Sequence, residues 1–83
     1  MANKIYYKDS VGRDIRGIDP SEMKRIASKI EKMLTQDVDA GKPLKNSEYR
    51  SLRVGNYRVI YIKVSDGVLI TRIGHRKDVY HDL

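Results

Sequence analysis

The run Leu52-Arg-Val-Gly-Asn-Tyr-Arg-Val-Ile-Tyr61 decides the fold of this chain. Gly55 and Asn56 are turn residues, and the residues on both sides of them are mainly apolar, aromatic and basic side chains that suit strands. A second turn, Ser65-Asp66-Gly67, follows before another apolar run. We therefore predict strands over residues 49–54, 57–64 and 68–74, which short turns join into an antiparallel meander.

The segment before this meander predicts helices. Asp19-Pro20-Ser21-Glu22 is a capping box with Pro at the first helical position. Apolar residues then recur along one stripe of a helix with 3.6 residues per turn, at Met23, Ile26, Ala27, Ile30, Met33, Leu34 and Val38. We expect this helix to end at Gly41, before Pro43. Upstream, we expect a short strand over residues 4–8 and a short helix over residues 10–16.

One amphipathic helix can cover only one face of the meander, so we expect the other face to be open and lined by basic side chains. Side chains alternate between the two faces along a strand. If the hairpin loop comprises the three residues 65–67, Arg58 faces Gly74. Arg58, Arg72 and Arg76 then share the open face, with Gly74 as an uncovered floor between them. A two-residue turn is the alternative, and it shifts the register by one residue.

The positive charge of the chain is concentrated in its C-terminal half. The whole chain has 17 Lys and Arg against 11 Asp and Glu, a formal net charge of +6. Residues 42–77 hold nine basic and two acidic residues, a net charge of +7, whereas the net charge of residues 1–41 is +1. Localised positive charge favours a polyanion or an acidic protein as the partner, and a solvated surface is the alternative interpretation.

Other features of the composition argue against several classes of protein. The chain has no Cys, which excludes disulfides and thiolate metal sites, and its two His lack the spacing of a zinc site. No run of about 18 apolar residues and no signal-peptide core is present. We therefore expect a soluble cytoplasmic protein without a membrane span, a metal or a cofactor.

Two runs of the chain resemble the RelE/ParE superfamily of toxin proteins, and the RelE branch more than the ParE branch. They are Tyr49-Arg-Ser-Leu-Arg-Val-Gly-Asn-Tyr-Arg-Val-Ile-Tyr61 and Ile73-Gly-His-Arg-Lys-Asp-Val-Tyr80. The resemblance, which extends over nearly the whole chain, implies a single α+β domain over residues 1–83. The implied RelE-like fold is small and has a curved antiparallel β-sheet with N-terminal helices packed on one face.

The resemblance also implies a function. RelE-type proteins are the toxins of type II toxin–antitoxin systems, and a cognate acidic antitoxin silences them. Their activity is that of a ribosome-dependent endoribonuclease, which cleaves mRNA in the ribosomal A site and inhibits translation. The implied partners of this chain are therefore an acidic antitoxin, the ribosome and mRNA.

The matched motifs assign roles to individual residues. Arg58 matches the arginine of the family's Tyr-Arg-Val strand, Arg76 the arginine at the end of the final strand, and Tyr80 the tyrosine of the C-terminal Val-Tyr. By this resemblance the three are catalytic: the two arginines bind the scissile phosphate and Tyr80 stacks on a base. We also predict that the RNA is contacted by Arg50, Arg53, Arg72, His75 and Lys77.

The chain departs from the RelE pattern in one respect. RelE enzymes carry a lysine pair on the strand before Tyr-Arg, whereas this strand has Arg50 and Arg53 and no lysine. Arginine stays protonated and cannot act as a conventional base, but it stabilises negative charge that develops as a 2′-hydroxyl attacks the adjacent phosphodiester. His75 is the nearby side chain whose type suits proton transfer near neutral pH.

Two other hypotheses remain open from the sequence. The missing lysines keep open a family member that is catalytically inactive and only binds an antitoxin or RNA. A ParE-type inhibitor of DNA gyrase, on the same fold, is the other.

Overall fold

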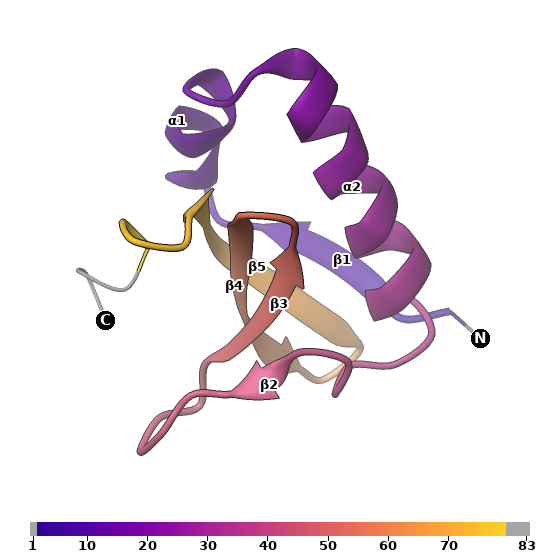
Figure 1. The fold of residues 1–83 in the computed structure, drawn as a ribbon. Coiled ribbons are helices and arrows are strands. Elements are labelled where there is room, and N and C mark those ends of the chain that lie inside the picture. Colours follow the sequence, from indigo (N-terminus) through magenta and orange to yellow (C-terminus); the bar gives the residue numbers. More distant parts are fainter. Residues whose placement is uncertain (1, 80–83) are drawn as a thin grey trace.

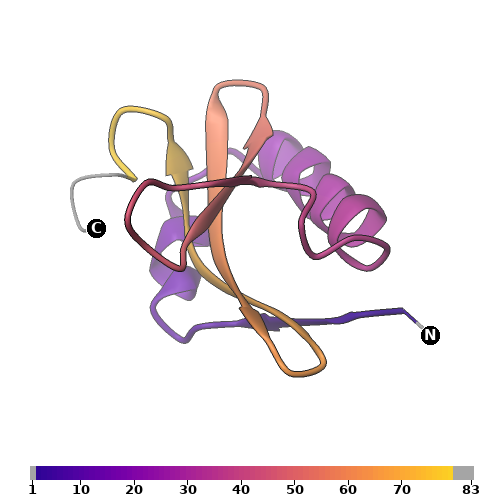
Figure 2. The same ribbon diagram turned by 90° about the horizontal axis from the view of Figure 1, so that it is seen from below.

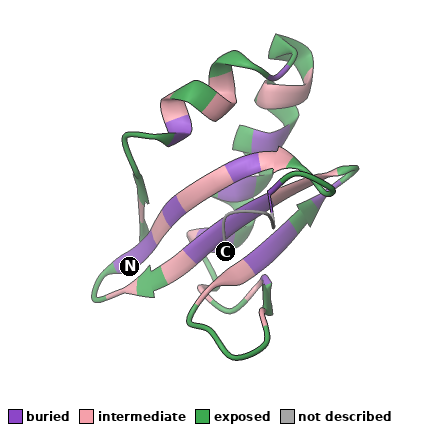
Figure 3. Ribbon diagram, turned by 90° about the vertical axis from the view of Figure 1, so that its left-hand side faces the viewer, coloured by how far each residue is buried: buried purple, intermediate pink, exposed green. Residues whose placement is uncertain are grey.

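A computed structural model describes residues 2–79 of the protein as an α+β fold, with one five-stranded sheet in the order β1-β5-β4-β3-β2 (Figure 1). The elements along the chain are β1 (Lys4–Tyr7), α1 (Val11–Arg16), α2 (Pro20–Leu34), β2 (Lys42–Pro43), β3 (Arg50–Val54), β4 (Tyr57–Val64) and β5 (Gly67–His75). Figure 3 shows α2 behind the sheet and α1 along one edge of it. Within residues 2–79, no helix is long and apolar enough to span a membrane.

The core lies between α2 and the sheet. The buried side of α2 consists of Ile26, Ile30 and Leu34, as the apolar stripe of the sequence predicts. These residues pack with the buried side chains of one sheet face, which are Leu52, Val54, Val59, Tyr61, Val68, Ile70 and Ile73. Val11 of α1 joins the same cluster. Burial of these apolar side chains stabilises the fold. Figure 2 shows α2 on one side of β3 and β4, and no helix of residues 2–79 covers their other face.

The start of α2 confirms the predicted cap. Asp19 is the N-cap residue, its carboxylate accepts a hydrogen bond from the backbone N–H of Ser21 at 2.9 Å, and Pro20 occupies the first helical position. The hydroxyl of Ser21 donates to the same carboxylate oxygen at 2.6 Å. These hydrogen bonds favour the ionised carboxylate and hold the pKa of Asp19 below its ordinary value.

The prediction that this helix continues to Gly41 is wrong, because α2 ends at Leu34. The backbone after the helix binds the sheet instead. The hydroxyl of Tyr61 donates to the carbonyl of Val38 at 2.8 Å and accepts from the backbone N–H of Gly41 at 2.9 Å. A Cβ at Gly41 would lie 2.8 Å from a ring carbon of Tyr61 and 2.9 Å from the backbone of Ser51. Gly41 therefore permits this close approach rather than capping the helix.

The β4–β5 hairpin also differs from the prediction. Val64 pairs with Gly67, so the connecting turn has two residues and the predicted three-residue loop is wrong. Tyr61 pairs with Ile70, but Ile60 pairs with Arg72, which leaves one extra residue on β5. An extra residue of this kind is a β-bulge, and it moves the register of the remaining strand by one position.

The extra residue is Thr71, whose hydroxyl donates to the carbonyl of Ile60 at 3.1 Å. Beyond this bulge, Arg58 pairs with Gly74, as predicted from the three-residue loop. The predicted register is therefore confirmed at the end of the hairpin where the candidate site lies. The bulge, and not the turn, produces it.

The sheet is mixed rather than antiparallel throughout, because β1 joins β5 as a parallel edge strand. The two strands lie very close together at Gly67, where an added Cβ would lie 1.9 Å from the backbone oxygen of Lys4. Only glycine fits at this position without displacing β1.

We expect substitution of Gly67 by Ala to destabilise the protein by about 2 kcal/mol, because the new methyl group collides with the backbone of β1. Equilibrium unfolding in urea measures this change. Gly12→Ala is the matched control: the nearest atom to its Cβ is a side-chain nitrogen of Arg16 at 3.6 Å. The control variant is expected to be as stable as the wild type or up to about 1 kcal/mol more stable. Equal unfolding midpoints for Gly67→Ala and wild type would contradict the close packing of β1 on β5.

The ion pair that holds the segment after α2 makes part of the stability depend on pH. Lys63 donates to the carboxylate of Asp39 at 2.9 Å, and this hydrogen bond lowers the pKa of Asp39, with a smaller contribution from Arg50. A lowered pKa stabilises the fold above the ordinary pKa of Asp, and this contribution is lost as the pH falls through the folded-state pKa. In urea unfolding at pH values from about 6 to about 2, Lys63→Gln is expected to lose less stability on acidification than wild type. Parallel stability curves for the two proteins would refute this role of Lys63, and Lys24→Gln on α2 is the control.

Candidate nucleic-acid interface

Two arginines lie side by side on the open face of the sheet. Arg53 of β3 and Arg58 of β4 are directly paired in the register, on the face opposite to Val59 and the core. Arg58 donates to the backbone carbonyl of Tyr57 at 3.1 Å, and Arg53 is exposed. Neither guanidinium forms an ion pair with a carboxylate of residues 2–79. Like charges at directly opposite positions destabilise a strand pair.

Both arginines line a hollow of about 500 Å³ at the free edge of β3, beyond the end of β2. Its basic side chains are Lys29, Lys42, Arg53 and Arg58, and its apolar lining includes Met33, Pro43, Leu44 and Leu52. No carboxylate lines this hollow, and none of its four basic side chains has an ion-pair partner in the described part of the chain. Guanidinium and ammonium groups in this arrangement suit the oxygens of one or more phosphates.

Arg76 lies at the same end of the sheet as Arg58. It directly follows β5, its side chain is exposed, and its backbone N–H donates to the carbonyl of Asn56 in the β3–β4 turn at 3.0 Å. Lys77 is exposed in the next position. The third predicted catalytic residue, Tyr80, lies outside the described residues.

The prediction that Gly74 forms an uncovered floor between arginines is wrong. Residues 76–79 form a turn that returns toward the sheet, and Val79 is completely buried. A Cβ at Gly74 would lie 2.8 Å from a methyl carbon of Val79. Because Gly74 is paired with Arg58, the side chain of Val79 occupies the place where a phosphate was expected to approach the backbone.

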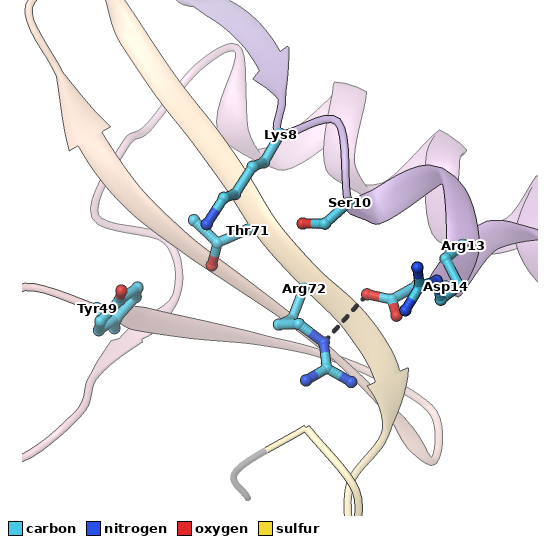
Figure 4. A pocket seen from close by; sticks show the side chains of 7 residues that line it. All are labelled: Lys8, Ser10, Arg13, Asp14, Tyr49, Thr71 and Arg72. Atoms are coloured by element: carbon cyan, nitrogen blue, oxygen red, sulfur yellow. Dashed lines mark hydrogen bonds and ion pairs between the residues drawn. The ribbon is translucent and has the colours of Figure 1, made fainter. Parts of the chain in front are cut away.

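Arg72 lies on the open face, but its side chain turns toward α1 and not toward Arg58. Its Nε donates to Asp14 at 3.2 Å, and the same carboxylate oxygen accepts the backbone N–H of Ile73 at 3.0 Å (Figure 4). The three predicted arginines therefore do not converge on one point. Arg58 and Arg76 are at one end of the sheet, and Arg72 is held at its edge.

Two other predicted RNA contacts belong to the opposite face. Arg50 is paired with Tyr61, and its side chain donates to the backbone carbonyls of Gly41 and Asp39 at 3.0 and 3.1 Å. That side chain is only 17% exposed and supports the segment after α2. His75 faces Tyr57, with ring centroids 6.0 Å apart and an interplanar angle of 72°. The structure therefore brings Arg53 and Arg58 together, with Arg76 nearby, and separates Arg50 and His75 from them.

Some side chains that line hollows on this protein were not singled out from the sequence. Lys29 and Lys42 join the arginines of the first hollow, and Lys8, Arg13 and Tyr49 line a second one. They lie on α1, α2 and β2, directly after β1 and directly before β3, and no spacing in the sequence links them. Residues 2–79 contain no cluster of three His, Asp or Glu side chains that could hold a metal ion.

Comparison with solved structures shows which fold this is. The chain is similar to the RelBE2 toxin–antitoxin complex of Mycobacterium tuberculosis, with a TM-score of 0.80, 23% identity and coverage of 92% of this chain and 100% of that chain. The RelB–RelE antitoxin–toxin complex of Methanococcus jannaschii has a TM-score of 0.74 at 25% identity, with 94% and 98% of the chains covered. A double mutant of the E. coli toxin RelE in the free state has the same TM-score, 0.74, at 13% identity, with 95% and 88% covered.

Sequence comparison gives the family. No curated protein matches the chain at a significant level. The family model described as the ParE toxin of the type II toxin–antitoxin system parDE matches residues 5–80, almost the whole chain. With a RelE-like fold and this match, the chain belongs to the RelE/ParE superfamily of type II toxin–antitoxin toxins.

Proposed function

We propose that this toxin is an endoribonuclease that cleaves mRNA in the ribosomal A site and thereby inhibits translation. The observation that carries the proposal is the hollow at the edge of β3, where four basic side chains meet and no carboxylate of residues 2–79 is present. The paired arginines Arg53 and Arg58 have no counter-charge within residues 2–79. A bound phosphate backbone supplies that counter-charge.

The proposed chemistry is attack of a ribose 2′-hydroxyl on the adjacent phosphorus. The P–O5′ bond breaks, the 2′-oxygen loses its proton to solvent, and the departing 5′-oxygen gains one. Negative charge develops on the phosphorus oxygens in the transition state, and Arg58 and Arg76 stabilise it. Donors that are already in position for such charge are often the largest contribution to catalysis. The proposal assigns base stacking to Tyr80 and RNA contacts to Arg53, Arg72 and Lys77.

The proposed partners follow from this activity and from the relatives. The similar structures include complexes of a toxin with its antitoxin. We infer that an acidic antitoxin binds this chain as well, because its basic surface offers complementary charge. The ribosome and mRNA complete the set of partners, and they place the proposed activity in the cytoplasm.

A second candidate is inhibition of DNA gyrase. The observation that favours it is the description of the matching family model, which is that of a ParE toxin. In this alternative the basic surface binds a protein, and the toxin does not cleave RNA.

We expect Arg58→Ala and Arg76→Ala each to slow mRNA cleavage by about 10²–10³-fold, since each removes a positioned donor for the transition state. The measurement is a translation reaction on a defined mRNA, with cleavage sites mapped by primer extension. Arg16→Ala, at an exposed position of α1, is the control and is expected to cleave like wild type. Circular dichroism establishes that all variants are folded. Cleavage at the wild-type rate by both Arg58→Ala and Arg76→Ala would show that the site is elsewhere.

We expect the wild-type protein to leave the supercoiling activity of purified DNA gyrase unchanged at concentrations that cleave translated mRNA. Inhibition of supercoiling together with intact mRNA would reject the endoribonuclease and establish the second candidate. An intact mRNA and an unaffected gyrase would leave a catalytically inactive protein that binds an antitoxin.

A further inference from the structure

A second hollow, of about 380 Å³, lies between the start of β3, the second half of β5 and α1 (Figure 4). Its size is in the range that holds a small ligand. Lys8, Arg13 and Arg72 bring three positive charges to it, and Asp14 brings one negative charge. Asp14 already accepts hydrogen bonds from Arg72 and from the backbone N–H of Ile73, so its charge is compensated within the protein. The hollow therefore carries a net positive charge that suits an anion.

Lys8 and Arg13 are the side chains available to such an anion. Both are exposed, and neither forms an ion pair with a carboxylate of the described residues. Lys8 follows β1 directly and its backbone N–H donates to the carbonyl of Ile70 at 2.9 Å, so its Cα is held at the edge of the sheet. Arg13 lies on α1, which the contacts of Asp14 attach to β5.

Tyr49 lies across the hollow from α1, as Figure 4 shows. Its backbone is held on both sides: its N–H donates to the hydroxyl of Ser47 at 3.2 Å, and its carbonyl accepts from Leu44 at 2.9 Å. A half-buried tyrosine on a fixed backbone offers a ring on which any of the four bases can stack. An aromatic platform opposite two cations that have no ion-pair partner in residues 2–79 is an arrangement that suits a nucleotide of a single strand.

The second hollow is close to the proposed cleavage site. Arg58 pairs with Gly74, two residues from Arg72 on β5, and both arginines lie on the open face. Such diagonal neighbours are about 7–8 Å apart. A single strand whose phosphate lies at Arg58 therefore reaches this hollow with a neighbouring nucleotide.

We propose that the hollow between Tyr49 and α1 binds a nucleotide of single-stranded RNA that flanks the cleaved one. Its base stacks on Tyr49, and its phosphate lies between Lys8 and Arg13. The inference rests on the proposed function, because it takes RNA as the substrate and Arg58 as the cleavage site.

The test is the affinity of the purified protein for a fluorescein-labelled single-stranded RNA oligonucleotide, measured by fluorescence anisotropy over a range of salt concentrations. We expect Lys8→Ala and Arg13→Ala each to weaken binding and to lower the slope of log affinity against log salt by about 0.7. Tyr49→Ala is expected to weaken binding by about 5- to 100-fold, whereas Tyr49→Phe, which keeps the stacking ring, retains wild-type affinity. Lys24→Ala and Lys32→Ala, at exposed positions of α2, are the matched controls and are expected to bind like wild type.

Wild-type affinity and salt slope in both Lys8→Ala and Arg13→Ala would overturn the inference, as would the absence of RNA binding by the wild-type protein at low salt. Unchanged binding by the Lys8→Ala and Arg13→Ala variants, together with loss of mRNA cleavage in Arg58→Ala, rejects the flanking site and keeps the proposed function. RNA binding that depends on Lys8, Arg13 and the ring of Tyr49 supports the site. If mRNA nevertheless stays intact during translation, the proposed endoribonuclease activity is rejected and the RNA-binding site is retained.

Discussion

The β-bulge at Thr71 is the constraint on which both faces of the sheet depend. Without it, the two-residue turn would pair Arg58 with Ile73, which would turn Ile73 toward solvent and Arg72 toward the core. The extra residue lets Ile70 and Ile73 both reach the core although they are three positions apart. It also puts the charged side chain of Arg72 on the open face, where it pairs with Asp14 instead of entering the core. One inserted residue thus completes the apolar core and keeps Arg58 of β4 and Arg72 of β5 on the opposite face.

The outer edge of β5 needs a hydrogen-bond acceptor, and a carboxylate supplies it. β1 covers only the first half of β5, from Gly67 to Ile70. Beyond it, the backbone N–H of Ile73 would lack an acceptor, and Asp14 of α1 provides it while pairing with Arg72. This contact attaches a six-residue helix to the sheet. Asp14 and Arg72 also line the second hollow, so the contact that attaches α1 to the sheet shapes this surface as well.

The pair of Arg53 and Arg58 works against stability. A chain of 83 residues buries a limited core, and two adjacent guanidinium groups that pair with no carboxylate of residues 2–79 lower its stability further. A surface that carries this cost and gathers two more lysines at one hollow is best explained by a partner with negative charge. An RNA backbone and an acidic antitoxin both meet this requirement. In the proposed function the two would compete for the same surface.

Local residue preferences determined much of this protein. They gave the start of α2, the turn at Gly55 and Asn56 and the alternation that separates Arg58 from the core, because capping, turn geometry and strand alternation act between residues close in the chain. Tertiary structure decided the end of α2, the bulge, the partner of Arg72 and the cover over Gly74. Each of these depends on groups far apart in the sequence: Tyr61 binds the backbone of residues 38–41, and Asp14 binds β5. Such contacts form only when the sheet and helices come together, so the fold and not a motif brings Lys29 and Lys42 to the first hollow and Lys8 and Arg13 to the second.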